Sequence, residues 1–110
     1  MNDNNFLSSG MVDPVEMLPG VHRRTMVTTD DMMLVEITLD KGAVVPMHRH
    51  ANHQVGYVIS GEIELTIDGV VRVCKPGDSY AMPGNVDHRA LAVTDCLVID
   101  IFAPPREDYR

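Results

Sequence analysis

Three histidines and a glutamine are the residues whose types and spacing point most directly to chemistry. His48 and His50 are two residues apart, so their side chains point the same way on an extended strand. Gln54 follows four residues later, and His88 comes from a distant segment behind the turn-forming run Pro83-Gly84-Asn85. A mixed set of imidazole nitrogen and oxygen donors suits a divalent transition metal with an open coordination position. We predict that these four side chains bind one metal ion, and their types do not choose among zinc, nickel, iron, manganese and copper.

The other interpretation of each histidine, taken alone, is an ordinary surface residue near a loop. The chain has five histidines, and only His22 and His53 fall outside the pattern. Because imidazole is the commonest metal ligand in proteins, the four residues together favour the metal site.

Size and charge limit the classes of function. A chain of 110 residues with 45% hydrophobic residues is expected to fold as one domain with its own core. The formal net charge of −7 argues against nonspecific nucleic-acid binding, which needs a basic surface. It does not exclude a small anionic ligand, because local arginines can outweigh the overall charge at close range. No apolar run approaches the roughly 20 residues of a membrane-spanning helix, and we expect a cytoplasmic protein.

The two cysteines lie in apolar, strand-like surroundings, at Cys74 and Cys96. We expect both to be buried and reduced, because a disulfide is unfavourable in a reducing compartment.

The pattern from Val21 onward is that of β-strands separated by turns. Residues 33–39 are β-branched and alternating, and Asp68-Gly69 is typical of a two-residue hairpin turn of type I′. The further predicted strands are 55–60, 62–67, 70–74, 79–82, 86–93 and 97–102. Turn signals every 8–12 residues without helical periodicity predict an all-β sandwich or barrel.

Residues 1–20 are polar at first and are then interrupted by Pro14, Pro19 and Gly20. They are expected to form an arm with little regular structure, and residues 21–110 the β-barrel domain. The arm either lies across a neighbouring subunit or is a frayed terminus.

The spacing of these residues resembles the cupins. The first cupin motif is matched by residues 42–61, with Gln54 where a glutamate ligand is usual. The second is matched by residues 77–88, with Asn85 in place of a glycine; asparagine also tolerates the left-handed conformation. The resemblance implies a single small jelly-roll β-barrel and, as in many small cupins, a homodimer.

A narrower resemblance is to the KdgF-type cupins, which linearise unsaturated uronic acids released from pectin or alginate. They share the His-x-His pair followed by a glutamine ligand, a Gly-Asp-Ser second motif, and a C-terminal Asp-x-Phe run before a proline and Arg-Glu-Asp. Here the C-terminal run reads Asp100-Ile101-Phe102-Ala103-Pro104-Pro105-Arg106-Glu107-Asp108. The resemblance implies that Asp100, Phe102 and Arg106 line a pocket beside the metal.

The chemistry of these side chains is consistent with that assignment. A glutamine in place of glutamate leaves the full charge on a divalent ion, which favours an anionic sugar. We expect Asp100 to move protons if it faces inward with Val98 and Phe102; the other possibility is an exposed position on an edge strand.

The remaining candidates concern the pocket wall. Arg106 could bind a substrate carboxylate with two hydrogen bonds or could be a solvated terminal residue. Phe102 could pack on a sugar ring or fill the core. Tyr57, Met47 and Arg24 are further candidates for the wall.

Three functions remain open at this level. The first is a metal-dependent cupin that linearises 4,5-unsaturated monouronates to a ring-opened keto form. The second is a metal-dependent dioxygenase or oxidase, and the third is a non-catalytic sugar- or metabolite-binding module.

Overall fold

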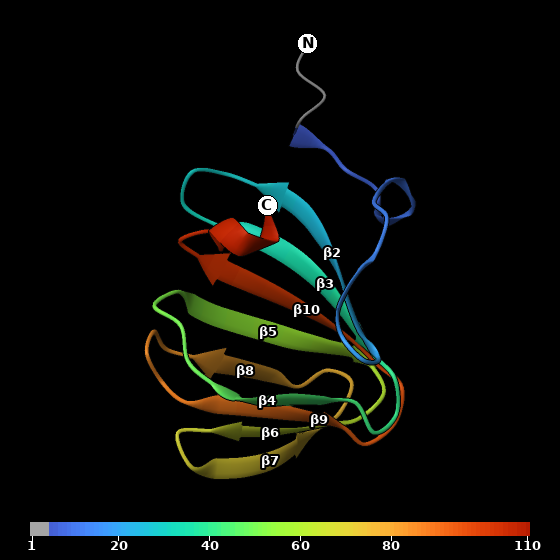
Figure 1. Cartoon of the computed structure of the whole chain (residues 1–110), viewed down its shortest axis with the longest axis vertical. Coiled ribbons are helices and arrows are strands. Elements are labelled where there is room, and N and C mark those ends of the chain that lie inside the picture. Colours follow the sequence, from blue (N-terminus) through green and yellow to red (C-terminus); the bar gives the residue numbers. More distant parts are fainter. Residues whose placement is uncertain (1–4) are drawn as a thin grey trace.

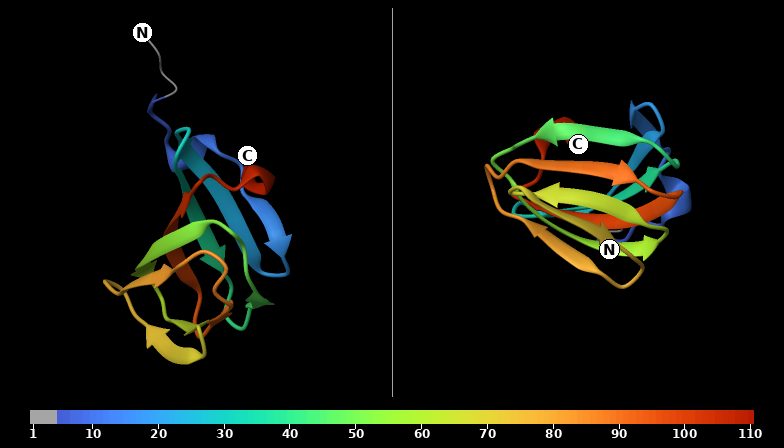
Figure 2. Two further views of the ribbon diagram at one scale, coloured as in Figure 1. Left: turned by 90° about the vertical axis from the view of Figure 1, so that its left-hand side faces the viewer. Right: turned by 90° about the horizontal axis from the view of Figure 1, so that it is seen from below.

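The protein consists of two antiparallel β-sheets that lie face to face (Figures 1 and 2). The computed structural model describes residues 5–110. One sheet has six strands in the order β1 (Val15–Leu18), β2 (Val21–Thr28), β3 (Met33–Leu39), β10 (Cys96–Ala103), β5 (His53–Ser60) and β8 (Ser79–Met82). The other has four strands in the order β4 (Val44–His48), β9 (His88–Ala92), β6 (Ile63–Ile67) and β7 (Val70–Cys74). The predicted all-β fold is therefore confirmed.

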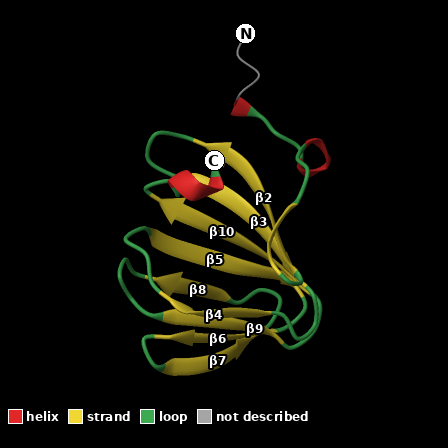
Figure 3. Cartoon of the chain, viewed as in Figure 1, coloured by secondary structure: helices red, strands yellow, loops and turns green. Residues whose placement is uncertain are grey.

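Helical structure in the described residues is limited to short 3-10 turns (Figure 3). They include η2 (Ser9–Met11) and η3 (Glu107–Tyr109). No helix in residues 5–110 has the length and hydropathy needed to cross a membrane.

Buried and partly exposed residues alternate strictly along β3 and β10, and the buried ones form much of the core. Every second residue of both strands is buried, from Met33 to Leu39 and from Cys96 to Phe102. The alternation follows from the two-residue period of a strand, which sends successive side chains to opposite faces. Because β10 lies between β3 and β5, whatever it carries on its inner face is enclosed on both sides.

Two predicted turn features are present. Asp68 and Gly69 both have positive φ, at 49° and 79°, as a type I′ hairpin between β6 and β7 requires. Asn85 has a φ of 64°, the left-handed conformation that allows asparagine to replace a glycine here. Cys74 and Cys96 are both buried and unpaired within the described residues, as expected.

The N-terminal segment departs from the prediction of little regular structure. Val15–Leu18 form strand β1, which pairs with β2, and Met17 and Leu18 pack against the core. The predicted boundary between residues 20 and 21 thus falls inside a β-hairpin. The two prolines lie just outside β1 rather than within it, so they do not interrupt its hydrogen bonds.

Candidate metal centre and pocket

The three predicted histidines converge from two neighbouring strands of the four-stranded sheet. His48 ends β4 and His88 begins β9, and the two residues are paired in the ladder. His50 follows β4 in a loop, and its ring centroid lies 4.8 Å from that of His88. One ring nitrogen of each histidine lies within 4.8 Å of the others. This is the spacing of a three-histidine metal site.

Hydrogen bonds to backbone carbonyl groups determine the orientation and the tautomer of the three imidazole rings. Each Nδ1 donates a hydrogen bond of 2.8–2.9 Å to the carbonyl of a residue two positions away in sequence. The acceptors are Pro46 for His48, Asn52 for His50 and Val86 for His88. A carbonyl can only accept, so each Nδ1 carries the hydrogen and each Nε2 presents a lone pair. A hydrogen bond from Nδ1 to a carbonyl group orients an imidazole so that its Nε2 can bind a metal.

The surroundings of His50 and His88 favour the neutral form of both rings. Burial lowers the pKa of His50, and the charge of Arg106 lowers it further. Burial is also the largest cause of the lowered pKa of His88. His88 is only 4% exposed, and its Nε2 is a buried acceptor without a hydrogen-bond partner within the described part of the chain. A neutral, unpartnered imidazole nitrogen is what a divalent cation requires of a ligand.

Gln54 reaches this group from β5 in the opposite sheet. Its side chain is buried, and its Oε1 lies 3.1 Å from Nε2 of His50. Because Nε2 of His50 carries a lone pair, two acceptors face one another, and a cation between them would satisfy both. The Gln54 amide is also hydrogen-bonded to the Asp100 carboxyl group. Three imidazole nitrogens and one amide oxygen therefore fit a divalent transition ion.

Asp100 lies on the inner face of β10 and is 2% exposed. The inward orientation expected for this residue is the one observed. Its Oδ1 accepts a hydrogen bond of 2.5 Å from the hydroxyl group of Tyr80. Tyr80 and Asp100 are the cross-strand partners of Gly56, one on each side of β5.

The short bond between Tyr80 and Asp100 depends on the missing side chain at Gly56. A Cβ at this position would collide with both the Tyr80 ring and the Asp100 carboxyl group. Tyr80 was not among the sequence candidates. The available signal was the glycine within a predicted strand, which often marks a close approach of other groups.

Burial raises the pKa of Asp100 to about 6, and the hydrogen bonds from Tyr80 and Gln54 oppose that rise. Burial, and next the charge of Asp100, raise the pKa of Tyr80 far above its usual value. Tyr80 thus stays protonated as a donor, while Asp100 can take up and release a proton near neutral pH.

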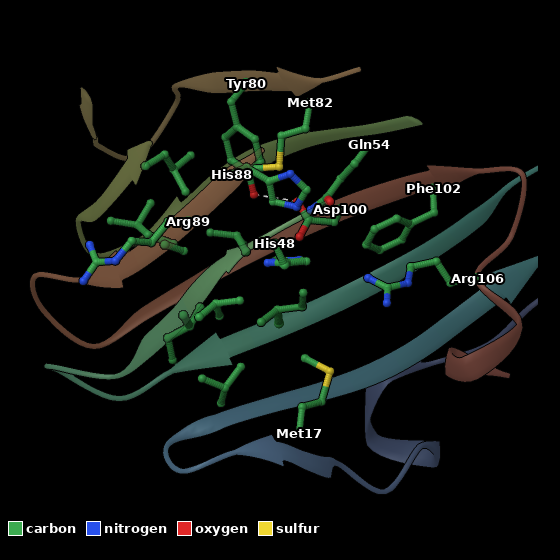
Figure 4. Close-up of a pocket in the computed structure, with 18 of the residues that line it drawn as sticks. Met17, His48, Gln54, Tyr80, Met82, His88, Arg89, Asp100, Phe102 and Arg106 are labelled. Carbon is green, nitrogen blue, oxygen red and sulfur yellow. Dashed lines mark hydrogen bonds between the residues drawn. The ribbon is translucent and has the colours of Figure 1, made fainter. Parts of the chain in front are cut away.

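One pocket connects these groups (Figure 4). His48, Gln54 and His88 lie on one side, Asp100 lies at its inner wall, and Phe102 and Arg106 lie toward one end. Further apolar side chains close the rest of the wall, including Met17, Val45, Leu65 and Met82. Met17 was not expected here, because the segment that carries it was predicted to be irregular.

Arg106 sits among aromatic rings at the pocket mouth. Its guanidinium carbon lies 4.1 Å from the ring centroid of Tyr109 and 5.6 Å from that of Phe102. Its Nε and Nη2 donate to the two carboxylate oxygens of Asp108, at 3.2 and 2.9 Å. The residue thus lines the pocket as expected, but the two-nitrogen edge that could bind a substrate carboxylate is engaged by Asp108.

Three of the sequence candidates lie elsewhere. Tyr57 is 47% exposed on the outer face of β5, so the prediction that it lines the pocket is wrong. Met47 is 50% exposed and lies at the rim of a shallow depression beside His48, outside the enclosed pocket. Arg24 also lines no part of the pocket, because its Nε donates to the carbonyl of Val12. Alternation along β5 and β2 turns Tyr57 and Arg24 away from the interior, whereas Met47 lies within the register shift between Val45 and His48.

Comparisons with known proteins agree with this geometry. The Cupin domain family model matches residues 35–102. The chain is 34% identical over 96 residues to the pectin degradation protein KdgF of Dickeya dadantii (strain 3937), a match covering 86% of this chain and 87% of that protein. The solved structure of KdgF from Halomonas sp. superposes with a TM-score of 0.91 at 36% identity, covering 96% of this chain and 97% of that one. The chain is also 33% identical over 95 residues to the H2HPP isomerase of Bacillus subtilis, covering 83% of this chain but 39% of that protein.

Proposed function

The chain belongs to the cupin family, and from this we propose that it is a metal-dependent enzyme that linearises 4,5-unsaturated monouronates to a ring-opened keto form. The likeness to KdgF of Dickeya dadantii, a pectin degradation protein, supports a substrate of this class. The observation that carries the proposal is the position of Asp100. A buried carboxyl group with a pKa of about 6 lies in the same pocket as His48 and His88, whose ring nitrogens converge with that of His50.

Different residues of the site bind the metal ion, the substrate carboxylate and the sugar ring. His48, His50, His88 and Gln54 would hold the ion, which when bound supplies a positive charge that polarises a substrate oxygen. The charge of Arg106 draws the substrate carboxylate to the mouth of the pocket. Phe102, which is fully buried and edges the pocket, packs on the sugar ring.

Asp100 carries the proton transfers. As a carboxylate it accepts the proton of the anomeric hydroxyl group at C1, and the bond between C1 and the ring oxygen breaks. This leaves an aldehyde at C1 and an enolate at C5. Asp100 then returns the proton to C4, and a ketone forms at C5. The proton count is unchanged, and Tyr80 stabilises the carboxylate form of Asp100 before the first transfer and after the second.

The proposal is tested by incubating the metal-loaded protein with unsaturated monouronates and following the loss of double-bond absorbance. We expect decay in the wild type under strict anaerobiosis, and none with His48→Ala or Asp100→Ala. Equal decay in all three proteins would reject the proposal. A strict requirement for oxygen would favour the dioxygenase or oxidase, and ligand binding without product would favour the binding module.

We further propose that the protein works as a cytoplasmic homodimer. Because β1 is part of the six-stranded sheet, the sizing experiment should remove residues 1–14 and leave β1 in place. A shift to monomer would assign the interface to this segment, and an unchanged dimer would place the interface elsewhere.

A further inference from the structure

Arg23 lies beside the pocket mouth and was not among the sequence candidates. It follows the buried Val21 by two residues on β2, so its side chain points toward the same face of the sheet. Its guanidinium carbon lies 4.8 Å from the ring centroid of Tyr109, the ring that also contacts Arg106. Two guanidinium groups therefore share one aromatic ring.

Among the described residues, the guanidinium group of Arg23 contacts the Tyr109 ring but has no hydrogen-bond or ion-pair partner. Four arginines of the described chain are partly buried. Three of them have a partner: Arg24 donates to the carbonyl of Val12, Arg89 pairs with Glu64, and Arg106 pairs with Asp108. Within residues 5–110, Arg23 forms no ion pair or hydrogen bond, and its Nε is fully buried without a partner. A buried donor on a charged group is costly to leave unsatisfied, which indicates a site for an anion.

Two carboxylates lie near Arg23 without forming an ion pair with it, although the charge of Arg23 contributes to the lowered pKa of Asp108. Glu16 lines the same depression, but it lies 3.8 Å from His22. Asp108 also lines the depression, but its two oxygens accept from Arg106. Within the described residues, Arg23 therefore has its terminal nitrogens free of hydrogen-bond and ion-pair partners, in the planar arrangement that matches a carboxylate.

The depression that Arg23 lines adjoins the metal pocket. His48, Arg106 and Tyr109 line both of them, and so do Met17 and Val45. A sugar acid placed with one oxygen toward the histidines could thus extend its carboxylate toward Arg23.

We propose that Arg23 is the carboxylate-binding residue of this pocket and the main source of its preference for sugar acids over neutral sugars. The proposal rests on the proposed function for the identity of the substrate, but not for the presence of an anion site. Arg106, held by Asp108, adds charge and positions Tyr109 and Phe102, whereas Arg23 supplies the paired hydrogen bonds.

The test compares galacturonate with galactose, which differ at the carboxyl group, as ligands of the zinc-loaded protein. Affinities are measured by NMR titration for the wild type, Arg23→Gln, Arg23→Lys and Arg72→Gln. Arg72 is exposed on β7 in the other sheet, so its replacement removes the same charge away from the pocket.

We expect Arg23→Gln to weaken galacturonate binding roughly 10- to 100-fold, the range for a lost charge-assisted interaction, and to leave galactose binding unchanged. Arg23→Lys should keep part of the wild-type affinity for galacturonate. The control variant Arg72→Gln should bind galacturonate as tightly as the wild type does. Because Arg23→Gln removes an unsatisfied buried donor together with the contact to the Tyr109 ring, it should change the unfolding temperature of the ligand-free protein little. In turnover of an unsaturated monouronate, the same variant should raise KM and leave kcat within a few-fold.

The inference is overturned if Arg23→Gln binds galacturonate as the wild type does, if it loses galactose equally, or if the wild type does not distinguish the two sugars. Arg23-dependent binding without turnover would reject the proposed reaction alone. Turnover with an unchanged KM in Arg23→Gln would reject the role of Arg23 alone.

Discussion

The two faces of strand β5 reverse the usual arrangement of polar and apolar side chains. The inner face carries the buried apolar Val58, but also Gln54, which is buried, and Gly56, which leaves room for Tyr80 and Asp100. The outer face carries Val55, Tyr57 and Ile59, each about half exposed. Antiparallel sheets normally bury their apolar face and expose their polar one. Polar groups are tolerated inside this sheet because they hydrogen-bond to one another or converge on one point, and that convergence marks the site.

The comparison predicts that the inner face controls activity. Asp100→Asn should lower kcat about 100- to 10,000-fold, the range for loss of a general acid–base group, and should leave substrate affinity within a few-fold. Steady-state kinetics on an unsaturated monouronate measure both quantities. A variant with more than a tenth of the wild-type kcat would remove Asp100 from the reaction.

The same substitution should stabilise the metal-free protein. Burial raises the native pKa of Asp100 from 3.8 to about 6, so the native state binds the proton more tightly than the unfolded chain. The carboxyl group therefore destabilises the fold as pH rises from about 4 to about 6, by up to about 3 kcal/mol at higher pH. Urea unfolding should show Asp100→Asn to be more stable than wild type at pH 8 and equal to it at pH 3.5. The opposite sign would mean that Asp100 is a net stabilising residue.

Gly56→Ala should disturb the inner face without changing any polar group. The added methyl group meets the Tyr80 ring and the Asp100 carboxyl group, so the two must separate. We expect a loss of about 1–3 kcal/mol in the free energy of unfolding, together with reduced kcat. Gly10→Ala is the matched control, because a Cβ there meets no atom within 4 Å. Wild-type stability in Gly56→Ala would contradict the close packing across β5.

Tyr80→Phe should have a smaller and pH-dependent effect. Its hydroxyl group lowers the pKa of Asp100, so removing it raises that pKa and leaves less carboxylate at a given pH. We expect about a tenfold loss of kcat near neutral pH, the effect of one lost hydrogen bond to a charged group, and an acid limb shifted to higher pH. A pH–rate profile measures both. If the acid limb of the pH–rate profile did not shift, Tyr80 would have no effect on the pKa of Asp100.

Tyr57→Ser should have the smallest effect, because this tyrosine is on the outer face. We expect kcat and KM within about twofold of wild type, since exposed positions away from the site contribute little. A tenfold change in either constant would show that the outer face takes part in function after all.

Much of the fold was predictable because it follows from local rules. The alternation in residues 33–39 and the Asp68-Gly69 turn depend only on strand period and turn geometry, and both are observed as expected. Strand β1 was missed because its burial pattern does not alternate and prolines flank it. It is held in place by pairing with β2, which is a tertiary contact.

The candidate site divides in the same way. His48, His50, Gln54 and His88 were recognisable because their spacing along the chain is distinctive, and they lie together. Tyr57 was placed wrongly because the alternation of side chains along β5 shows only which residues share a face of the strand. The fold decides which of the two faces points inward. Tyr80, Arg23 and Tyr109 were missed because nothing near them in sequence distinguishes them.

The order of residues along the chain was thus sufficient to determine most of the strands, the turns and the types of atom offered to an ion. It did so because those properties depend on neighbours a few positions apart. The stacking of the strands decided that Asp100 and Tyr80 meet across Gly56, and that Arg23 and Arg106 share Tyr109. These contacts join residues up to 86 positions apart in sequence, between Arg23 and Tyr109, and no local preference of the chain specifies them.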